Sequence, residues 1–373
     1  MRILQVISGL GNGGAEKFIV ELSNRLSKEH EVCLLSFRSV QEHLTAPKKI
    51  GPKVRFITLG KKKGLSFSLP FHLIKVFRKF KPDVVHLHLN STIKYIYLIH
   101  WFFPKVRYVH TLHSGVCDEK KDLFVSLKRF PKYSSHFVNV CISASIYRDF
   151  KKLYPEFRFV NIDNGIEPIG TSKNEATVKR EIEQISHNHT RKLFLAIGGF
   201  KKLKNFPMLV EALKKINANG IRAELILIGD HESANNEIDM KEVSDPHVHL
   251  AGFQKNVADY LKHADALLIG SYIEGLPLVV LEALATGTPI ISTPVGGVPD
   301  AVVDAKNGFI ASSMEAEGMQ DAIEKFMRLT TDELQEMSST NKKDFDSRFS
   351  MESCAGRYEE LFRQPDFAKV GYD

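Results

Sequence analysis

Short apolar runs recur along the whole chain and alternate with longer segments whose apolar residues follow helical spacing. Uninterrupted apolar runs of this kind are typical of buried parallel strands, which crossover helices connect. The runs form two sets on either side of the polar, helix-like segment 170–190. The predicted strands are 3–7, 32–37, 54–59, 84–89, 106–111 and 137–142 in the first set, and 193–197, 223–228, 248–250, 266–269 and 289–293 in the second. We therefore expect an α/β protein with two doubly wound, Rossmann-like domains.

The length of the chain also favours two domains, since 373 residues exceed what one hydrophobic core usually supports. The absence of a strand signal in 170–190 predicts a boundary near residue 168. An N-terminal domain is expected over 1–168 and a C-terminal domain over 169–347. The remaining segment, about 348–373, carries apolar residues at helical spacing.

Composition narrows the class of protein. Hydrophobic residues make up 43% and charged residues 25%, values typical of a soluble globular protein. The four cysteines show no metal-ligand spacing, and a reducing cytoplasm suits them best. No run approaches the roughly 18 apolar residues of a membrane span. The first apolar run, 3–7, is expected to be a strand and not a signal peptide, because it is short and meets glycines.

Charge is distributed unevenly between the two parts of the chain. Residues 1–168 carry 28 Lys and Arg against 13 Asp and Glu, whereas the remainder carries 23 against 31. Basic residues and phenylalanines interleave over 61–81. This segment is expected either to contact an anionic membrane or acceptor, or to be a solvated face over an ordinary core. Nucleic acid is not an expected partner, because no binding motif accompanies the charge.

Two glutamates eight positions apart, Glu274 and Glu282, lie in a segment that reads as strand, loop and helix. Glu274 follows the predicted strand 266–269, and Glu282 lies within apolar residues at helical spacing over 276–284. In an open parallel sheet this turn lies at the carboxyl edge, where ligands bind. The amides of Gly275, Leu276, Pro277 and Leu278 are expected to point at an anion from the helix N-terminus. Carboxylates beside such amides suit a nucleotide sugar, which has both hydroxyls and a diphosphate.

The segment resembles the retaining nucleotide-sugar glycosyltransferases of family four, which have two Rossmann-like domains facing a cleft, the GT-B fold. Their hallmark is similar to Glu274, seven residues and Glu282, and the flanking sequences 271–277, 285–291 and 296–300 match as well. The resemblance implies that Glu274 binds hydroxyls of the donor sugar and that Glu282 binds the ribose. It also implies a C-terminal helix that crosses back to the N-terminal domain, which would bind the acceptor, while the C-terminal domain binds the nucleotide sugar.

A glycine-rich loop, 9–14, follows the first predicted strand. It lacks the G-x-G-x-x-G spacing and the acidic residue of an NAD site, so it is either a tight turn or a sugar- or phosphate-binding loop. Gly13 and Gly14 resemble the donor-binding loop of the family. His113, at the end of the strand 106–111, is expected to titrate near neutrality. The resemblance places it beside the reacting carbon of the donor. His86 and His88 share one strand face but have no partner at ligand spacing, which disfavours zinc.

Lys204 matches the lysine with which the family neutralises the leaving diphosphate, but Gly199 stands where an arginine is usual. Lysine does not reproduce the bidentate fork that arginine offers to phosphate. Either Lys201 or Lys202 is expected to substitute for it, so that both are candidate donor-binding residues, or the helix amides bind more of the diphosphate charge. His113, Glu274 and Lys204 form the predicted catalytic set.

Together these features predict a retaining hexosyltransferase that needs neither a metal nor a cofactor, since no Asp-x-Asp pattern is present and the nucleotide sugar is a co-substrate. Its expected partners are a nucleotide sugar, with a UDP-sugar favoured, and a glycan or lipid-linked acceptor of surface polysaccharide biosynthesis. It is expected in the cytoplasm or at the inner face of the membrane. Two alternatives remain at this point: a sugar-nucleotide epimerase of the same architecture, and a noncatalytic protein that binds nucleotide sugars.

Overall fold

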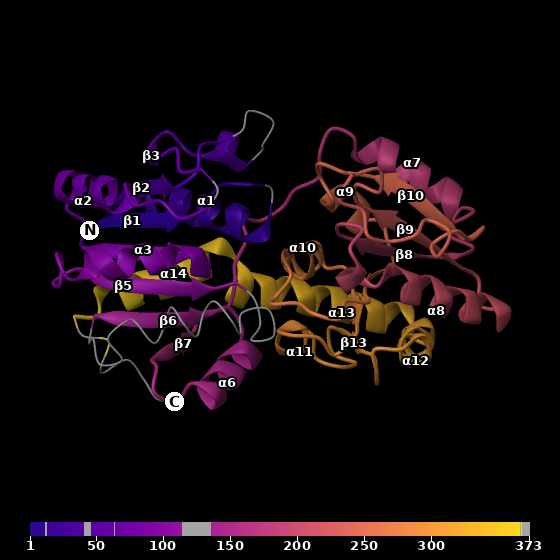
Figure 1. Cartoon of the computed structure of the whole chain (residues 1–373). Coiled ribbons are helices and arrows are strands. Elements are labelled where there is room, and N and C mark those ends of the chain that lie inside the picture. The colour runs from indigo at the N-terminus through magenta and orange to yellow at the C-terminus, as the bar shows by residue number, and fades with distance from the viewer. Residues whose placement is uncertain (12, 41–45, 63, 114–135, 366, 368–373) are drawn as a thin grey trace. The chain divides into compact units, whose positions relative to one another are not determined.

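The chain divides into two α/β units, each built around a parallel sheet (Figure 1). The first unit contains Met1–Glu167 and the segment from Ser350 onward, and the second contains Pro168–Phe349. The structure is a computed structural model that describes all residues of the chain except 12, 41–45, 63, 114–135, 366 and 368–373. The predicted fold class, two doubly wound α/β domains, is confirmed.

The first unit has a seven-stranded sheet in the order β3-β2-β1-β4-β5-β6-β7, with every neighbouring pair parallel. Successive strands are added on one side of β1 up to β3, and then on its other side from β4 onward. This reversal between β1 and β4 is a topological switch point, where open α/β sheets commonly bind ligands. The strands are β1 (Arg2–Ile7), β2 (Glu31–Ser36), β3 (Arg55–Thr58), β4 (Val84–His88), β5 (Arg107–Leu112), β6 (Phe137–Cys141) and β7 (Phe159–Asn161).

Amphipathic helices bury one apolar face against this sheet. In α2 (Leu69–Phe80), for example, Leu69, Leu73, Phe77 and Phe80 are buried at helical spacing, while the intervening basic side chains face outward. The other described helical elements of this unit are α1 (Gly14–Leu26), the 3₁₀ turn η1 (Ala46–Lys49), α3 (Asn90–His100), α6 (Ala144–Leu153) and α14 (Met351–Arg363).

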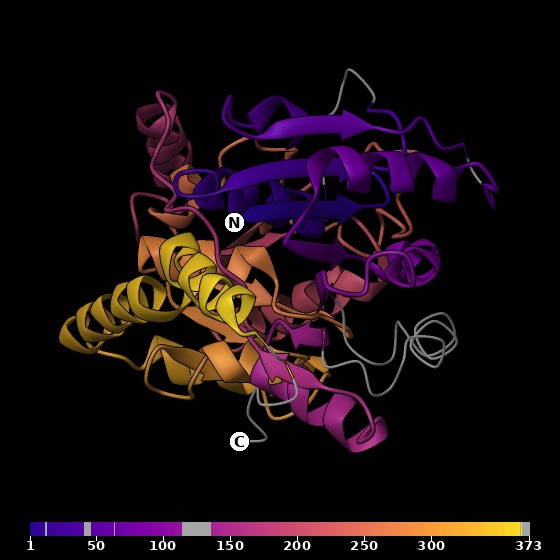
Figure 2. The same cartoon turned by 90° about the vertical axis from the view of Figure 1, so that its left-hand side faces the viewer.

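The C-terminal helix α14 belongs to the first unit and packs against α1 (Figure 2). It begins where the Met351 amide donates to the Ile166 carbonyl at 2.7 Å. Gly165 allows this approach, because a Cβ there would lie 2.5 Å from Cβ of Cys354. Farther along, the buried Tyr358 hydroxyl forms a 2.8 Å hydrogen bond with Thr111 of β5. These contacts join the last described helix to the sheet formed by the start of the chain.

The second unit has a six-stranded parallel sheet in the order β10-β9-β8-β11-β12-β13. Its strand order reverses between β8 and β11, which again creates a switch point. The strands are β8 (Lys192–Ile197), β9 (Ala223–Ile228), β10 (Val248–Gly252), β11 (Ala266–Ile269), β12 (Ile290–Ser292) and β13 (Gly308–Ile310). The helical elements are α7 (Glu175–Ile185), the 3₁₀ turn η2 (Lys202–Lys204), α8 (Phe206–Ala218), α9 (Ala258–Leu261), α10 (Leu278–Thr286), α11 (Val298–Ala301), α12 (Ala316–Met327), α13 (Thr331–Asp344) and the π-helical turn η3 (Phe345–Phe349).

Each run predicted as a strand coincides with an observed strand to within two residues at either end. Two further strands, β7 and β13, were not predicted because each contains only two large apolar residues, Phe159 and Val160 in β7 and Phe309 and Ile310 in β13. The helix predicted over 276–284 begins two residues later, at Leu278, since Pro277 keeps an extended conformation as its N-cap. In the parts of the chain that the structure describes, no helix has the length and apolarity to span a membrane.

Candidate active site

Glu274 lies in the loop between β11 and α10, at the carboxyl edge of the second sheet, as the sequence predicts. Its carboxylate accepts a hydrogen bond from the Lys204 ammonium at 2.5 Å and one from the Ser271 hydroxyl at 2.7 Å, both to Oε1. The Glu274 side chain is 12% exposed and that of Lys204 is 28% exposed. Two of the residues predicted to act on the donor are thus in direct, charge-assisted contact.

Lys204 reaches this position from the loop after β8 through two backbone features. The amide of Tyr272 donates to the Leu203 carbonyl at 2.9 Å, which joins the loop after β8 to the loop after β11. Gly198 lies under the Lys204 stem, where a Cβ would come within 3.2 Å of Cε. The neighbouring strands β8 and β11 therefore bring together groups that are 70 residues apart in the sequence.

Gly296 packs directly against the backbone of the Glu274 loop. Its φ is +51°, and a Cβ at this position would lie 2.0 Å from the Glu274 carbonyl oxygen. Next to it, the Gly297 amide donates to the Gly275 carbonyl at 2.5 Å. Glycine is required at 296 both by the left-handed backbone and by this close approach. The sequence pattern included Gly296 and Ser271, but it assigned no contact to either of them.

The N-terminus of α10 differs in detail from the predicted cradle of four amides. Pro277 has no N–H group and is the N-cap, so it cannot donate to an anion. The amide of Val280 is already bonded to the Pro277 carbonyl at 3.1 Å. Leu278 and Val279 supply the first amides of the helix, and no acidic residue lies in its first turn. The positive end of the helix is therefore formed by fewer donors than expected.

Glu282 lies in the second turn of α10 and is partly buried. It is four positions after Leu278, so about one helical turn lies between its backbone and the helix N-terminus. This spacing places a carboxylate beyond the amides, on the same short helix. Glu274 and Glu282 therefore flank the first turn of α10 along the chain.

Lys201, which is expected to substitute for the missing arginine, forms an ion pair with a carboxylate of its own unit. Its ammonium donates to Glu237 at 2.9 Å and also to the Asn235 carbonyl, so it is already held by a carboxylate. That contact is the main cause that lowers the pKa of Glu237 below its usual value. Lys202 is exposed, and its backbone amide also bonds Glu237. Gly199 itself has space, since a Cβ there would have its nearest contact at 3.8 Å.

In the first unit, Gly13 and Gly14 lie where α1 begins after β1. The side chain of Glu16, in the first turn of α1, folds back over this loop. A Cβ on Gly13 would lie 2.6 Å from one Glu16 carboxylate oxygen. A carboxylate in this position accepts hydrogen bonds from hydroxyls and repels phosphate. Of the two predicted ligands for this loop, the geometry favours a sugar.

His113 follows β5 and belongs to a row of hydrogen-bonded side chains. Its Nε2 lies 3.0 Å from Nδ1 of His88, whose Nε2 lies 2.8 Å from the Gln5 oxygen. Because an amide oxygen only accepts, His88 donates through Nε2 and accepts through Nδ1. His113 then donates through Nε2 to His88, which leaves its Nδ1 as an acceptor. Phe18 packs edge-on against the His113 ring at 5.6 Å between ring centroids.

The expectation that His113 titrates near neutrality is wrong. Burial, assisted by the nearby His110, lowers its pKa to about 3, so the ring is neutral at pH 7. The pKa values of His86 and His88 are also lowered, chiefly by burial. His86 bonds Thr111 at 2.7 Å. Among the described residues, no group of three or more His, Cys, Asp or Glu is arranged to hold a metal ion.

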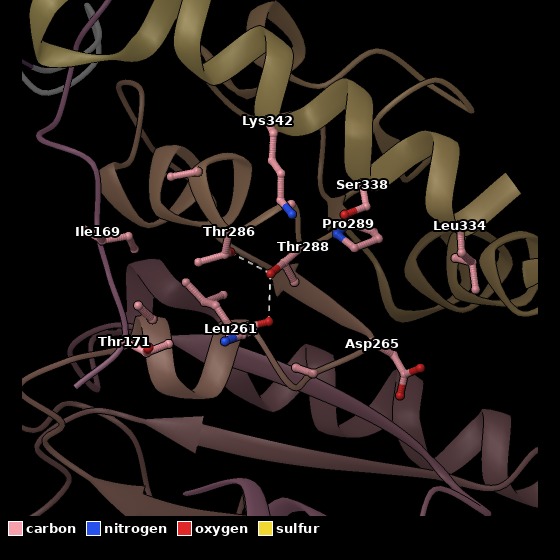
Figure 3. Close-up of a pocket in the computed structure, with 15 residues that line it drawn as sticks. Ile169, Thr171, Leu261, Asp265, Thr286, Thr288, Pro289, Leu334, Ser338 and Lys342 are labelled. Carbon is pink, nitrogen blue, oxygen red and sulfur yellow. Dashed lines mark hydrogen bonds between the residues drawn. The ribbon is translucent and has the colours of Figure 1, made fainter. Parts of the chain in front are cut away.

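A hollow of about 640 Å³ occurs at the other edge of the second sheet (Figure 3). Its lining includes Asp265 and Pro289, which directly precede β11 and β12, and therefore marks the amino ends of these strands. The Thr288 hydroxyl within it donates to the Leu261 carbonyl at 2.7 Å. Neither Glu274, Glu282 nor Lys204 lines this hollow. Since open α/β sheets bind ligands at the carboxyl ends, we do not assign the donor to it.

Comparison with known proteins identifies both halves of the chain. Residues 177–344 match the family described as Glycosyl transferases group 1, and residues 12–168 match Glycosyltransferase Family 4. The two matches together leave out only the ends of the chain and a short segment between them.

Two characterised relatives are similar over most of their length. One is a GalNAc-alpha-(1->4)-GalNAc-alpha-(1->3)-diNAcBac-PP-undecaprenol alpha-1,4-N-acetyl-D-galactosaminyltransferase of Campylobacter jejuni, 27% identical over 83% of this chain and 84% of the relative. The other is a UDP-Gal:alpha-D-GlcNAc-diphosphoundecaprenol alpha-1,3-galactosyltransferase of Escherichia coli, 25% identical over 72% of each chain. For three other relatives, the match spans only 47%, 49% and 58% of the relative's length.

The fold is shared with solved glycosyltransferase structures. A glycosyltransferase from Rickettsia africae superimposes with a TM-score of 0.79 and 17% sequence identity, over 99% of both chains. With the two family matches, this likeness confirms the resemblance drawn from the Glu274–Glu282 segment. The chain belongs to the group 1 glycosyltransferases of the GT-B fold, with a family four domain in its N-terminal half.

Proposed function

We propose that this chain transfers a hexose or an N-acetylhexosamine from a nucleotide sugar to a glycan or lipid-linked acceptor, with retention of the anomeric configuration. The observation that supports this most strongly is the contact of Lys204 with Glu274, in a loop that leads directly into α10. Two carboxylates and two helix-terminal amides along the segment 274–282, with the Lys204 ammonium from the loop after β8, match the groups of a nucleotide diphosphate sugar. The leaving diphosphate needs positive charge, and the two sugars offer hydroxyls.

The roles follow from where charge develops during transfer. The bond between the anomeric carbon and the β-phosphate oxygen breaks, and the nucleoside diphosphate leaves with both electrons. Lys204 and the amides of Leu278 and Val279 stabilise that negative charge. Glu274 binds hydroxyls of the donor sugar and Glu282 binds those of the ribose. The acceptor oxygen bonds to the anomeric carbon on the same face, and its proton passes to the departing phosphate, so no carboxylate nucleophile is required.

Binding of the donor changes the partners of Lys204. In the structure its charge is compensated by Glu274 at 2.5 Å. Before the donor binds, Glu274 keeps the Lys204 side chain oriented. A bound diphosphate would then share the Lys204 ammonium with Glu274. Such preorganised charges lower a barrier more than mobile ones, because they need not reorient during the reaction. No metal takes part in the proposed mechanism.

The first unit would supply the contacts to the acceptor and to one side of the donor sugar. His113 is neutral and presents Nδ1 as an acceptor, which suits a sugar hydroxyl. Gly13 and Gly14, with Glu16 above them, suit a second hydroxyl. In this proposal His113 lies beside the donor, as the resemblance implies, and accepts a hydrogen bond through Nδ1.

The names of the two relatives support a lipid-linked acceptor, and that of the Escherichia coli enzyme supports a UDP-sugar donor. We propose the same substrate classes here, in surface polysaccharide biosynthesis. An acceptor carried by a membrane lipid would bring the chain to the cytoplasmic face of the membrane. The net charge of +15 over residues 1–168, given by 28 basic and 13 acidic residues, suits anionic lipid there.

Analysis of products from a panel of UDP-sugars, with short lipid-diphosphate glycans as acceptors, tests this function. Transfer should yield a glycosylated acceptor with the α configuration from an α-linked donor, and it should persist in EDTA. An epimerase would instead convert the sugar without needing an acceptor, and a noncatalytic protein would yield no product. Lys204→Met should lower kcat/KM by about 10²–10³. The matched change Lys214→Met, on the exposed face of α8, should leave it unchanged.

A further inference from the structure

A second polar hollow lies at the carboxyl edge of the sheet in the first unit, apart from the residues discussed so far. It measures about 320 Å³ and is lined by three cationic side chains and two hydroxyls, those of Arg38, Lys61, Lys94, Ser8 and Ser91. They come from four places in the chain: Ser8 follows β1, Arg38 follows β2, Lys61 follows β3, and Ser91 and Lys94 lie in α3 after β4. The hollow therefore spans the β1–β4 switch point, where open α/β sheets bind ligands.

The charges in this hollow are not neutralised within the described part of the chain. Among those residues, no carboxylate forms an ion pair with Arg38, Lys61 or Lys94. The Lys61 ammonium instead donates to the carbonyls of Lys62 and Gly64, at 3.1 and 2.5 Å, and lies 5.7 Å from the centre of the Tyr95 ring. Three cations that converge without an acidic partner create a site suited to an anion.

The side chain of Arg38 is guided into this position by its neighbours. Its stem lies against Gly9, where a Cβ would come within 3.4 Å of Cδ, and Phe37 packs edge-on against Tyr95. A planar guanidinium with a fixed stem can bind two phosphate oxygens at once. The hydroxyls of Ser8 and Ser91 add neutral donors at the same edge. This set of groups matches a phosphate or diphosphate better than a neutral sugar.

One wall of the hollow continues into exposed apolar side chains. Leu65 lines the hollow and is 77% exposed, while Phe67 and Phe71, which follow it at the start of α2, are 89% and 70% exposed. The Ser66 amide donates to the Tyr95 hydroxyl at 3.2 Å, which joins this rim to the hollow. Exposed apolar side chains close together usually mark a binding surface. Beside an anion site, they suit an apolar chain attached to the phosphate.

We infer that this hollow binds the diphosphate of a prenyl-linked acceptor, with Leu65, Phe67 and Phe71 against the start of its prenyl chain. The inference rests on the proposed glycosyl transfer, and it specifies which part of the acceptor the first unit recognises. The diphosphate holds the acceptor in place, and the hollow takes no part in breaking or forming bonds. A soluble sugar phosphate shares the same anionic group but lacks the apolar chain, so the two sources can be separated.

Calorimetric titration with inorganic pyrophosphate and with farnesyl diphosphate tests this inference. Both titrations use saturating UDP, so that the donor site does not compete for the probes. Farnesyl diphosphate should bind at least about 10-fold more tightly than pyrophosphate, because its prenyl chain also buries apolar surface. The double variant Arg38→Ala, Lys94→Ala should weaken both by about 10-fold or more. The variant Phe67→Ser, Phe71→Ser should weaken only farnesyl diphosphate.

The control Lys79→Ala, which removes an exposed cation near the end of α2, should leave both affinities unchanged. Unchanged binding of both probes to the Arg38, Lys94 variant would overturn the inference. Equal affinity of the wild type for the two probes would also overturn it, since the site would then take a soluble anion. UDP binding by the same samples separates this failure from failure of the proposed function. A wild type that does not bind UDP refutes the proposed UDP-sugar donor, whatever the other probes do.

Discussion

At the scale of single residues, the candidate site depends on glycines whose missing side chain leaves space for neighbouring atoms. Gly296 lets the backbone of the Glu274 loop approach to a distance at which a Cβ would overlap the Glu274 carbonyl. Gly199 leaves open the position at which the family usually has an arginine. We therefore expect an added side chain to be harmful at position 296 and favourable at position 199.

Gly296→Ala should destabilise the protein and displace Glu274, because the new Cβ would lie 2.0 Å from a backbone oxygen at a φ of +51°. We expect the free energy of unfolding to fall by roughly 2–4 kcal/mol, from strain in the left-handed region and from the overlap. Urea unfolding measures this change. Gly220→Ala is the matched control, since Gly220 has a φ of +86° but nothing within 4 Å of its Cβ position. Equal losses in both variants would show that the contact with Glu274 contributes nothing.

Gly199→Arg should tighten the binding of UDP. The nearest atom to a Cβ at 199 is 3.8 Å away, so the side chain fits, and a guanidinium adds a charged fork beside Lys204. We expect roughly a 10-fold lower Kd, which corresponds to about 1.4 kcal/mol. Titration calorimetry of Gly199→Arg and Gly199→Ala separates the guanidinium from the loss of glycine. Weaker or unchanged binding in the arginine variant would place residue 199 away from the diphosphate.

The contacts of the candidate site residues were harder to predict from the sequence than their positions in the fold. Glu274, Glu282 and Lys204 were singled out by spacing and resemblance, and the structure brings Lys204 to Glu274. The pairing of Lys201 with Glu237 was not predictable, because no local pattern connects residues 36 positions apart. The fold of Glu16 over the glycine loop was missed for a different reason. A glutamate in the first helical turn is common, and only the backbone conformation decides where it points.

At the scale of elements, strands β4 and β5 are unusual for the histidines that they bury. His86 and His88 lie in β4 and His110 lies in β5, all with no exposed surface. A strand buried on both faces normally carries only apolar residues. Each ring forms at least one hydrogen bond, such as that of His110 with Asn139 at 3.2 Å, although Nδ1 of His86 and Nε2 of His110 are buried without a partner among the described residues. Burial must then oppose their protonation.

Acid should therefore destabilise the first unit in a defined pH window. Burial lowers the pKa of His110 to about 4 and that of His113 to about 3, whereas histidine in an unfolded chain titrates near 6.5. Between these values the unfolded state binds more protons, so stability is full above pH 6.5 and is lost as the pH falls. Each such histidine contributes up to about 1.4 kcal/mol per pH unit.

Urea unfolding between pH 7 and pH 4.5 measures this dependence. His110→Asn should reduce the slope of unfolding free energy against pH by up to about 1.4 kcal/mol per unit. The control His187→Asn changes an exposed histidine and should keep the wild-type slope. A wild-type protein whose stability does not change over this range would contradict the neutral, buried state of the strand histidines.

Sequence patterns predict where helices and strands lie more accurately than they predict the residue at which each one begins. The strands with apolar runs were located within two residues, and the repeated βα pattern sufficed for the fold class. Leu278, and not Leu276, begins α10 because Pro277 ends the loop in an extended conformation. Periodicity alone does not reveal this, since Leu276 is also buried and continues the apolar pattern.

At the scale of the whole molecule, the two halves carry opposite net charge. Residues 1–168 hold 28 basic and 13 acidic residues, and the rest of the chain holds 23 and 31. In the proposed function, the positive half binds the acceptor, and a few cations of the other half bind the donor. The affinity for the membrane and the affinity for the nucleotide would then belong to different halves of the chain. The proposed attachment to an anionic membrane would then depend on the charge excess of the first half.

Binding to vesicles tests this view. The protein should sediment with vesicles that contain phosphatidylglycerol and remain in solution with pure phosphatidylcholine. Raising the salt concentration to about 0.5 M should release most of it, because screening shortens the reach of surface charges to a few ångströms. Phe67→Ser, Phe71→Ser should weaken the binding that persists at high salt. Equal binding to both lipids would contradict a role for the basic residues.

The central claim is that Lys204 and α10 bind the diphosphate of the donor while Glu282 binds its ribose. Comparing the affinities of UDP and uridine, by calorimetric titration of the wild type and two variants, tests it most directly. Lys204→Ala should abolish most of the advantage of UDP over uridine, and Glu282→Ala should weaken both ligands by a similar factor. The control Glu336→Gln should change neither affinity. If Lys204→Ala keeps the full preference for UDP, the diphosphate binds elsewhere and the proposed site is wrong.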